Sequence, residues 1–225
     1  MLEKTLEESN MKKCLIEVFG LGYVGFPLAI RLANGGFNVL GVDVNPERIS
    51  RLEKNELNET ELNIKKEFLH VREENLLNFS DRPNKTDCQK IAFICVHTPI
   101  TTENIESDTY VKKAIETFLQ TSKKGDVIII ESSIGGGTTE KMQKVIENFG
   151  YTIGNDFGLC FCPERIDPQN KEWNLENIPR IIYCSDETTY KISQKLYQPV
   201  NHAHLQRVSS PKIAEVVKSY ENAFR

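Results

Sequence analysis

Apolar runs of strand length alternate with segments of helical spacing along most of the chain. The predicted strands cover residues 14–19, 38–44, 76–79, 91–96, 127–130, 159–162, 180–184 and 204–208. The predicted helices cover residues 25–34, 46–54, 108–122, 138–149, 187–197 and a last segment from 210 to the end. Because strands that alternate with helices favour a parallel sheet covered on both faces, the pattern predicts an α/β fold with a doubly wound, mainly parallel sheet.

The predicted elements divide the chain into three parts. Residues 1–12 form a polar tail, residues 13–208 hold the alternating strands and helices, and residues 209–225 begin a last helix. The chain ends within that helix without a cap or a stop signal, so we expect a helix that is cut short. Its apolar stripe, left uncovered, favours association. The stripe consists of Ile213, Ala214, Val217 and Tyr220.

A glycine motif lies between the first predicted strand and the first predicted helix. The run from Gly20 to Gly25 has the spacing Gly-x-Gly-x-x-Gly, and Asp43 follows 18 residues after Gly25. Gly20 allows a tight turn, Gly22 lets the backbone approach a pyrophosphate, and Gly25 lets the helix pack closely on the strand. The helix N-terminus attracts the phosphates, while Asp43 accepts hydrogen bonds from ribose hydroxyls and repels a 2′-phosphate. The motif predicts a Rossmann-type domain that binds NAD rather than NADP. The alternative is a glycine turn that binds no ligand, but this alternative does not explain the acid at the end of the second predicted strand.

Composition and charge narrow the classes of function. The chain has 225 residues, of which 39% are hydrophobic and 27% charged, as is ordinary for a soluble globular protein. Its net charge of −4 argues against non-specific binding of nucleic acid. No apolar run approaches the ~20 residues of a membrane helix, and the polar start of the chain lacks the apolar core of a secretory signal. We therefore expect a cytoplasmic protein with neither a nucleic-acid nor a membrane partner.

The six cysteines suggest buried thiols rather than a special site. Most lie in or beside apolar runs, where an unpaired cysteine is often buried as a small apolar side chain in a reducing compartment. Cys160 and Cys162 alternate along one predicted strand, so their side chains face the same side. Because further ligands at metal-binding spacing are lacking, we expect six unpaired thiols and no metal site. The cysteines are Cys14, Cys88, Cys95, Cys160, Cys162 and Cys184.

Several motifs, spread in order over nearly the whole chain, resemble those of the UDP-glucose/GDP-mannose dehydrogenase family. The branch that looks most similar comprises the UDP-N-acetyl-D-mannosamine and UDP-N-acetylglucosamine 6-dehydrogenases. Several motifs in the right order are far more specific than any one of them. The matching segments are GLGYVGFPLA (20–29), GVDVNPERI (41–49), CVHTP (95–99), SDTYVKKAI (107–115), ESSIGGGTTE (131–140), CPERIDP (162–168) and AEVVKSYENAFR (214–225).

The resemblance implies an NAD-dependent oxidoreductase of polysaccharide biosynthesis that oxidises the C6 hydroxyl of a UDP-sugar to a carboxylate. In that family two NAD molecules are reduced in turn, and a cysteine captures the intermediate aldehyde. The thiohemiacetal is oxidised to a thioester, which water then hydrolyses. The resemblance also implies a homodimer, with the last helix as the central connecting and dimerisation helix.

The family's functional residues carry over onto matching positions of this chain. Ser133 stands where the family usually has threonine and keeps the hydroxyl, and Lys218 and Asn222 share one helix face because they are four residues apart. The cofactor positions are Gly20, Gly22, Tyr23, Val24, Gly25, Asp43, Arg48, Thr98 and Ser133. The substrate positions are Glu164, Arg165, Ile166, Lys218, Asn222 and Arg225. The catalytic positions are Lys218, Asn222, Glu164 and Ser133.

Simpler structural roles compete at several of these positions. Lys218 and Asn222 fit a solvated helix face, and Glu164 fits a surface ion pair. Thr98 precedes a proline at the end of a predicted strand, and Ser133 fits a turn cap.

The chain also departs from the family, which leaves three hypotheses. The family's catalytic cysteine and second Rossmann-like domain lie beyond the last helix, and none of the six cysteines occupies a matching motif. The first hypothesis is the NAD-binding half of a nucleotide-sugar 6-dehydrogenase, ending at a truncation or a gene break, which binds NAD but is inactive alone. The second is a non-catalytic NAD-binding module, either a stable pseudoenzyme or the partner of a separately encoded second half, or a decayed fragment. The third, a dehydrogenase of the 3-hydroxy acid type, conflicts with the Pro-Glu-Arg motif and with the lysine and asparagine of the last helix.

Overall fold

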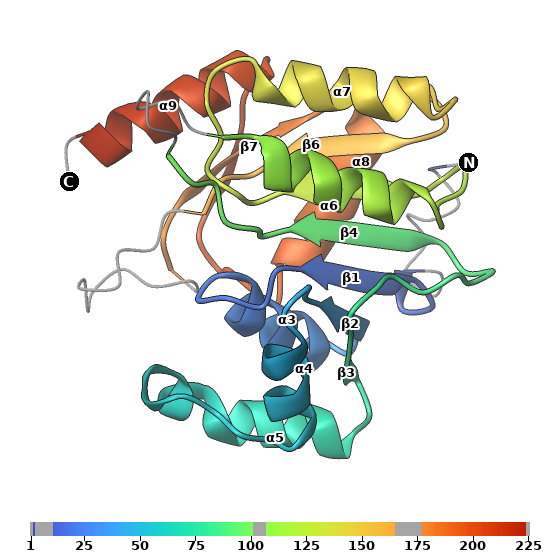
Figure 1. The fold of residues 1–225 in the computed structure, drawn as a ribbon. Helices are drawn as coiled ribbons and strands as arrows, with labels where there is room; N and C mark the ends of the chain where they lie inside the picture. Colours follow the sequence, from blue (N-terminus) through green and yellow to red (C-terminus); the bar gives the residue numbers. More distant parts are fainter. Residues whose placement is uncertain (1, 3–10, 101–106, 165–176, 224–225) are drawn as a thin grey trace.

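An eight-stranded sheet forms the centre of the molecule (Figure 1), in the order β3-β2-β1-β4-β5-β6-β7-β8. The computed structural model describes residues 2, 11–100, 107–164 and 177–223, with side chains as far as residue 221. The strands are β1 (Leu15–Phe19), β2 (Asn38–Val42), β3 (Leu77–Ser80), β4 (Lys90–Ile94), β5 (Val127–Ile130), β6 (Gly158–Phe161), β7 (Arg180–Cys184) and β8 (Leu205–Arg207).

The order of the strands reverses between β1 and β4. Strands β3, β2, β1, β4, β5 and β6 are parallel, β7 is antiparallel to β6, and β8 is parallel to β7. Leu15 of β1 is paired with Asn38 of β2 on one side and with Lys90 of β4 on the other. The chain winds outward in opposite directions from β1 and β4, so the strand order reverses between them, and α/β sheets bind ligands at the carboxyl ends of the strands at such a point. The doubly wound, mainly parallel sheet is as predicted.

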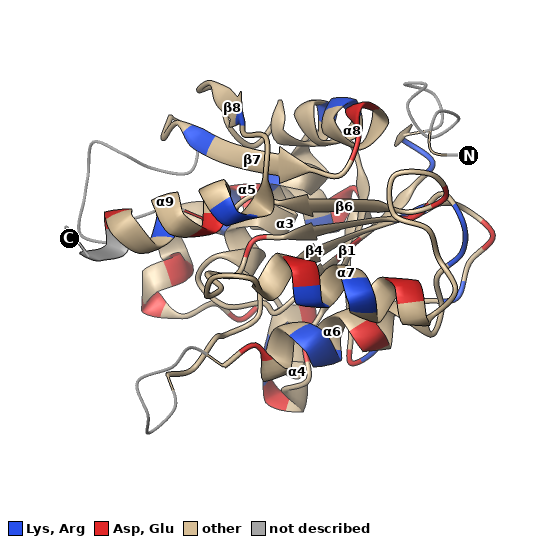
Figure 2. Ribbon diagram, turned by 90° about the horizontal axis from the view of Figure 1, so that it is seen from above, with Lys and Arg blue, Asp and Glu red and all other residues tan. Residues whose placement is uncertain are grey.

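Helices cover both faces of the sheet. Figure 2 shows α6 and α7 on one side of the strands and α8 on the other, with Lys, Arg, Asp and Glu positions coloured along α6 and α7. The helical elements are α3 (Gly25–Asn34), α4 (Pro46–Glu53), the 3₁₀ helix η1 (Glu59–Ile64), α5 (Lys65–Glu73), α6 (Thr109–Leu119), α7 (Thr138–Asn148), α8 (Glu187–Tyr197) and α9 (Pro211–Ala223). Within the described part of the chain, no helix is both long and apolar enough to cross a membrane.

Side chains along each strand point alternately to the two faces of the sheet, and each face forms a hydrophobic core. Ile16 and Val18 of β1 face one core, which α3, α5 and α8 cover, while Leu15 and Phe19 face the other, which α6 and α7 cover. Every residue of β1 is buried, because a parallel strand in the middle of a sheet has helices on both faces. The continuous apolar runs of the sequence reflect this double burial.

The expectation of six unpaired thiols is wrong for two cysteines. Cys160 of β6 is paired directly with Cys184 of β7, and their sulfur atoms form a disulfide across Cα atoms 4.3 Å apart. The pairing depends on the antiparallel direction of β7, which the apolar pattern of the sequence does not reveal. Cys162 faces the same core as Cys160, as expected. The cysteines outside the disulfide are Cys14, Cys88, Cys95 and Cys162.

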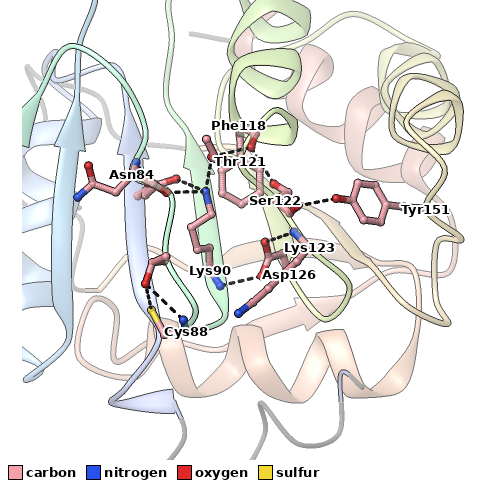
Figure 3. Close-up of polar contacts among 11 residues, drawn as sticks. Asn84, Cys88, Lys90, Phe118, Thr121, Ser122, Lys123, Asp126 and Tyr151 are labelled. Atoms are coloured by element: carbon pink, nitrogen blue, oxygen red, sulfur yellow. Dashed lines mark hydrogen bonds and ion pairs between the residues drawn. The ribbon is translucent and has the colours of Figure 1, made fainter.

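A buried polar cluster lies at the amino ends of β4 and β5 (Figure 3). Lys90 Nζ donates to Thr121 Oγ1 at 2.6 Å and pairs with Glu17 Oε2 at 3.3 Å. Asp126 accepts hydrogen bonds from the backbone N–H groups of Lys90 at 2.8 Å and Lys123 at 2.9 Å. The cluster satisfies polar groups that would otherwise be costly to bury.

Asp126 should make stability depend on pH. Burial raises the pKa of Asp126 from 3.8 to about 6, because desolvation outweighs the hydrogen bonds and the nearby lysines. The folded state therefore binds the proton more tightly than the unfolded state, and this stabilisation is lost as pH rises from about 4 to 6. We expect the free energy of unfolding of the wild type to fall over this window, relative to Asp126→Asn, by up to about 3 kcal/mol. Urea denaturation at several pH values measures it, and parallel pH profiles of the two proteins would contradict it.

Candidate functional site

The glycine motif forms the turn between β1 and α3. Gly20 has a φ of +88°, and a side chain there would lie 2.7 Å from the carbonyl oxygen of Cys95. A Cβ on Gly25 would lie 2.0 Å from the carbonyl oxygen of Gly20, whereas a Cβ on Gly22 would have no neighbour within 4 Å. No side chain caps the start of α3. The turn is therefore tight at its two ends and open at Gly22, as a site for a phosphate at a helix N-terminus requires.

The side chains of Asp43 and Arg48, which both follow β2 in the chain, hold this turn by hydrogen bonds to the backbone of Leu21. Asp43 Oδ2 accepts a hydrogen bond from Leu21 N–H at 2.7 Å, and Asp43 Oδ1 accepts one from Asn45 N–H at 2.9 Å. Arg48 Nε donates to the carbonyl oxygen of Leu21 at 3.0 Å. The strand predicted to reach residue 44 ends at Val42, although Asp43 N–H still donates to the carbonyl oxygen of Ser80 at 3.1 Å. Each carboxylate oxygen of Asp43 still has a lone pair for a ribose hydroxyl.

Three further predicted site residues follow the carboxyl ends of neighbouring parallel strands. Thr98 follows β4, Ser133 follows β5 and Glu164 follows β6, and the carboxyl ends of parallel strands meet at one edge. Glu164 is only 6% exposed, so a simple surface ion pair does not describe it. Desolvation raises the pKa of Tyr23, and the negative charge of Glu164 adds to this shift. Thr98 and Ser133 are half-buried.

A buried ionic network supports the ends of β5 and β6. The guanidinium of Arg180 pairs with Glu131 and donates to the carbonyl oxygen of Cys162 at 3.0 Å. Tyr197 donates its hydroxyl proton to Glu131, and the Arg180 guanidinium stacks 4.9 Å from the centre of the Tyr197 ring. Because Cys162 lies two residues before Glu164, the network fixes the backbone from which Glu164 extends.

Helix α9 is attached to the start of α7 by a buried carboxylate. Glu215 accepts hydrogen bonds from the N–H groups of Gly137 at 2.7 Å and Thr139 at 2.8 Å, and from the Thr139 hydroxyl at 2.7 Å. It supplies the cap that α7 lacks from its own sequence. Lys218, one turn further along α9, is 5% exposed, so it does not lie on a solvated helix face.

The predicted apolar stripe of α9 is partly wrong. Ala214 is fully buried and Val217 packs against the second core, because α9 lies against β7 and α7. The exposed apolar residues are Ile213, Val216 and Tyr220.

Four predicted site residues cannot be placed by their side chains. Arg165, Ile166 and Arg225 lie outside the described residues, and Asn222 is described only as part of the α9 backbone.

The unpaired cysteines next to this edge are poor nucleophiles. Burial raises the pKa of Cys162 to about 12 and holds the pKa of Cys95 well above its ordinary value. A thiol with such a pKa is protonated at neutral pH and does not attack an aldehyde. Among the described residues, no group of three or more histidine, cysteine, aspartate or glutamate side chains could hold a metal. Ser133 and Glu164 follow neighbouring strands on this side of the sheet, and the described cysteines next to them offer no thiolate.

Sequence reasoning missed three carboxylates that shape the site. Glu131 and Glu215 lie within the matched motifs, at 131–140 and 214–225, but their partners are far along the chain. Glu61 pairs with Arg48 from a segment without a regular apolar pattern. A polar residue inside an apolar strand end, such as Glu131, was the one available signal, since a buried charge needs a partner.

Comparison with known proteins identifies relatives of this chain. The profile of the UDP-glucose/GDP-mannose dehydrogenase family, NAD binding domain, matches residues 14–201. The UDP-N-acetyl-D-mannosamine dehydrogenase of Pyrococcus horikoshii is 33% identical over 211 residues, which cover 93% of this chain and 50% of that protein. The UDP-N-acetyl-D-glucosamine 6-dehydrogenase of Salmonella typhi is 32% identical over 93% of this chain and 49% of its own length.

Solved structures agree with the sequence comparisons. The structure of the Pyrococcus horikoshii UDP-D-ManNAc dehydrogenase superposes with a TM-score of 0.86 over 94% of this chain and 50% of that one, at 33% identity. An NDP-N-acetyl-D-galactosaminuronic acid dehydrogenase from Methanosarcina mazei has a TM-score of 0.86 over 100% of this chain and 50% of its own, at 27% identity. The chain thus spans about half the length of the relatives it matches.

Proposed function

Because this chain belongs to the UDP-glucose/GDP-mannose dehydrogenase family and carries its NAD-binding domain, we propose that it supplies the cofactor half of a UDP-sugar 6-dehydrogenase. The observation that carries the proposal is the row of groups at the carboxyl ends of successive strands. The glycine turn follows β1, Asp43 follows β2 and Glu164 follows β6, all on the carboxyl-end side of the parallel strands. An NAD bound along this edge would have its pyrophosphate at the start of α3.

The proposed reaction is the oxidation of the C6 hydroxyl of a UDP-sugar to a carboxylate, with two NAD as hydride acceptors. Bound NAD supplies the hydride acceptor. Lys218 stabilises negative charge on the reacting oxygen, and Glu164 and Ser133 hold or move protons near it. The burial of Lys218 and Glu164 supports these roles, because a water-poor site strengthens electrostatic interactions. In the same proposal Asn222, Arg165, Ile166 and Arg225 contact the sugar nucleotide.

The thiol of the second oxidation would come from outside residues 1–225. Burial keeps Cys162 and Cys95 protonated, so neither suits the capture of an aldehyde. We propose that a second half provides the cysteine, that the complete protein is a cytoplasmic homodimer, and that its product serves polysaccharide biosynthesis. The names of the relatives support an N-acetylated UDP-sugar as substrate.

A chimaera tests this function directly. Residues 1–225 would replace the first half of the Pyrococcus horikoshii relative, which they match over 50% of its length. With UDP-N-acetyl-D-mannosamine and NAD, the chimaera should form NADH, followed by absorbance. Lys218→Ala should lower the rate by roughly a hundredfold, the order of a lost proton-transfer or charge-stabilising group.

The matched control is Lys212→Ala on the same helix. Lys212 is exposed and pairs with Glu140 on the protein surface, so its loss should leave the rate within about twofold. A folded chimaera that binds NAD but forms no NADH would contradict the proposed function and would favour a non-catalytic NAD-binding module.

A further inference from the structure

Arg48 is a cation placed at the ribose end of the proposed NAD site. It belongs to the first turn of α4, whose start is capped by the Asn45 side chain. Its Nε donates to the Leu21 carbonyl oxygen, and its guanidinium lies 4.8 Å from the centre of the Phe26 ring. Asp43 binds the N–H group of the same residue, Leu21. An arginine beside this acid is the type of residue that accepts the 2′-phosphate of NADP in Rossmann folds.

Glu61 of η1 occupies the outer nitrogens of this arginine. Arg48 Nη2 lies 2.5 Å from Glu61 Oε1, and Nη1 lies 3.2 Å from Oε2, a bidentate pair. The two side chains are 12% and 13% exposed, so solvent screens the pair only in part. Arg48 therefore already has a carboxylate where a phosphate would bind.

Glu61 is held in place independently of Arg48. Its Oε2 accepts a hydrogen bond from Asn58 N–H at 2.9 Å, as part of a capping box at the start of η1. Asp43, Arg48 and Glu61 together carry one net negative charge, which disfavours a further anion beside the ribose.

We propose that Glu61 determines cofactor choice: it holds Arg48 away from a 2′-phosphate, and the chain therefore selects NAD over NADP. The inference rests on the proposed NAD site and adds to it a residue outside the glycine motif. Asp43 repels the 2′-phosphate directly, while Glu61 acts by neutralising the cation that would compensate for that repulsion. Glu61 touches Arg48 rather than the cofactor, so it is a specificity-determining residue that acts through another side chain.

Calorimetric titrations with NAD and with NADP test the proposal. In Glu61→Gln the amide keeps an acceptor for Asn58 N–H, but the charge that holds Arg48 is lost. We expect the ratio of NADP affinity to NAD affinity to rise roughly tenfold, the order of one charge-assisted hydrogen bond. The comparison is repeated with Asp43→Ser in both proteins, so that repulsion by Asp43 does not mask the effect.

Two controls separate this result from other causes. Glu59→Gln makes the same charge change on the same 3₁₀ helix at an exposed position, and it should leave the ratio unchanged. Adding Arg48→Gln to Glu61→Gln should abolish the gain. An unchanged ratio in folded Glu61→Gln that binds NAD, or a gain that persists without Arg48, would overturn the inference. A wild type that does not bind NAD would instead overturn the proposed cofactor site.

Discussion

Replacing Glu131 by alanine should lower the free energy of unfolding by about 3–5 kcal/mol, the cost of removing one partner of a buried ion pair. Glu131 and Arg180 are each 1% exposed at their side chains, so the substitution leaves the guanidinium charged and buried without its carboxylate. The Tyr197 hydroxyl loses its acceptor as well. Urea denaturation measures the loss.

An exposed ion pair is the matched control for Glu131. Asp81 and Arg82 are 61% and 79% exposed, and Asp81→Ala should cost less than about 1 kcal/mol because solvent screens such pairs. A loss of the same small size for Glu131→Ala would show that the network does not support the ends of β5 and β6.

Gly22→Ala should separate cofactor binding from folding. A Cβ at Gly22 meets nothing within 4 Å, so we expect the free energy of unfolding to change by less than about 0.5 kcal/mol. The added methyl group occupies the path by which a pyrophosphate approaches the backbone, so NAD affinity should fall at least roughly tenfold. Gly25→Ala should instead lower stability, because its Cβ would lie 2.0 Å from the Gly20 carbonyl oxygen and disrupt the turn itself. Unaltered NAD affinity in Gly22→Ala would place the cofactor elsewhere.

The pattern of apolar residues predicted much of the fold, because the strands are short and are buried on both faces of the sheet. Helix α3 begins and ends where its spacing predicted, and β5 and β7 have their predicted bounds. Strand β2 ends at Val42, two residues earlier than predicted, because an apolar run reports burial and does not mark where strand pairing stops. The direction of β7 was not predictable, because hydrophobicity reports burial and not the direction of a strand. The disulfide between Cys160 and Cys184 was missed for the same reason.

The candidate site was predictable where a motif carries its own geometry. The tight turn at Gly20 and Gly25 was predicted from glycines that lie close in sequence, and the spacing of the motif singled out Asp43, although its partner Leu21 lies 22 residues away. Glu61 and Glu215 act on partners 13 and 78 residues away, and no local pattern encodes such pairs. Lys218 was predictable only by resemblance, because a lysine on a helix is usually solvated, whereas this one is buried.

The most direct test of the account is a calorimetric titration of the purified 225-residue chain with NAD. The glycine turn, the uncapped start of α3 and Asp43 together predict saturable binding at one site. Circular dichroism on the same sample shows whether the chain is folded. A folded sample that takes up no NAD would contradict the central claim, and the turn would then be a remnant of a cofactor site that no longer works.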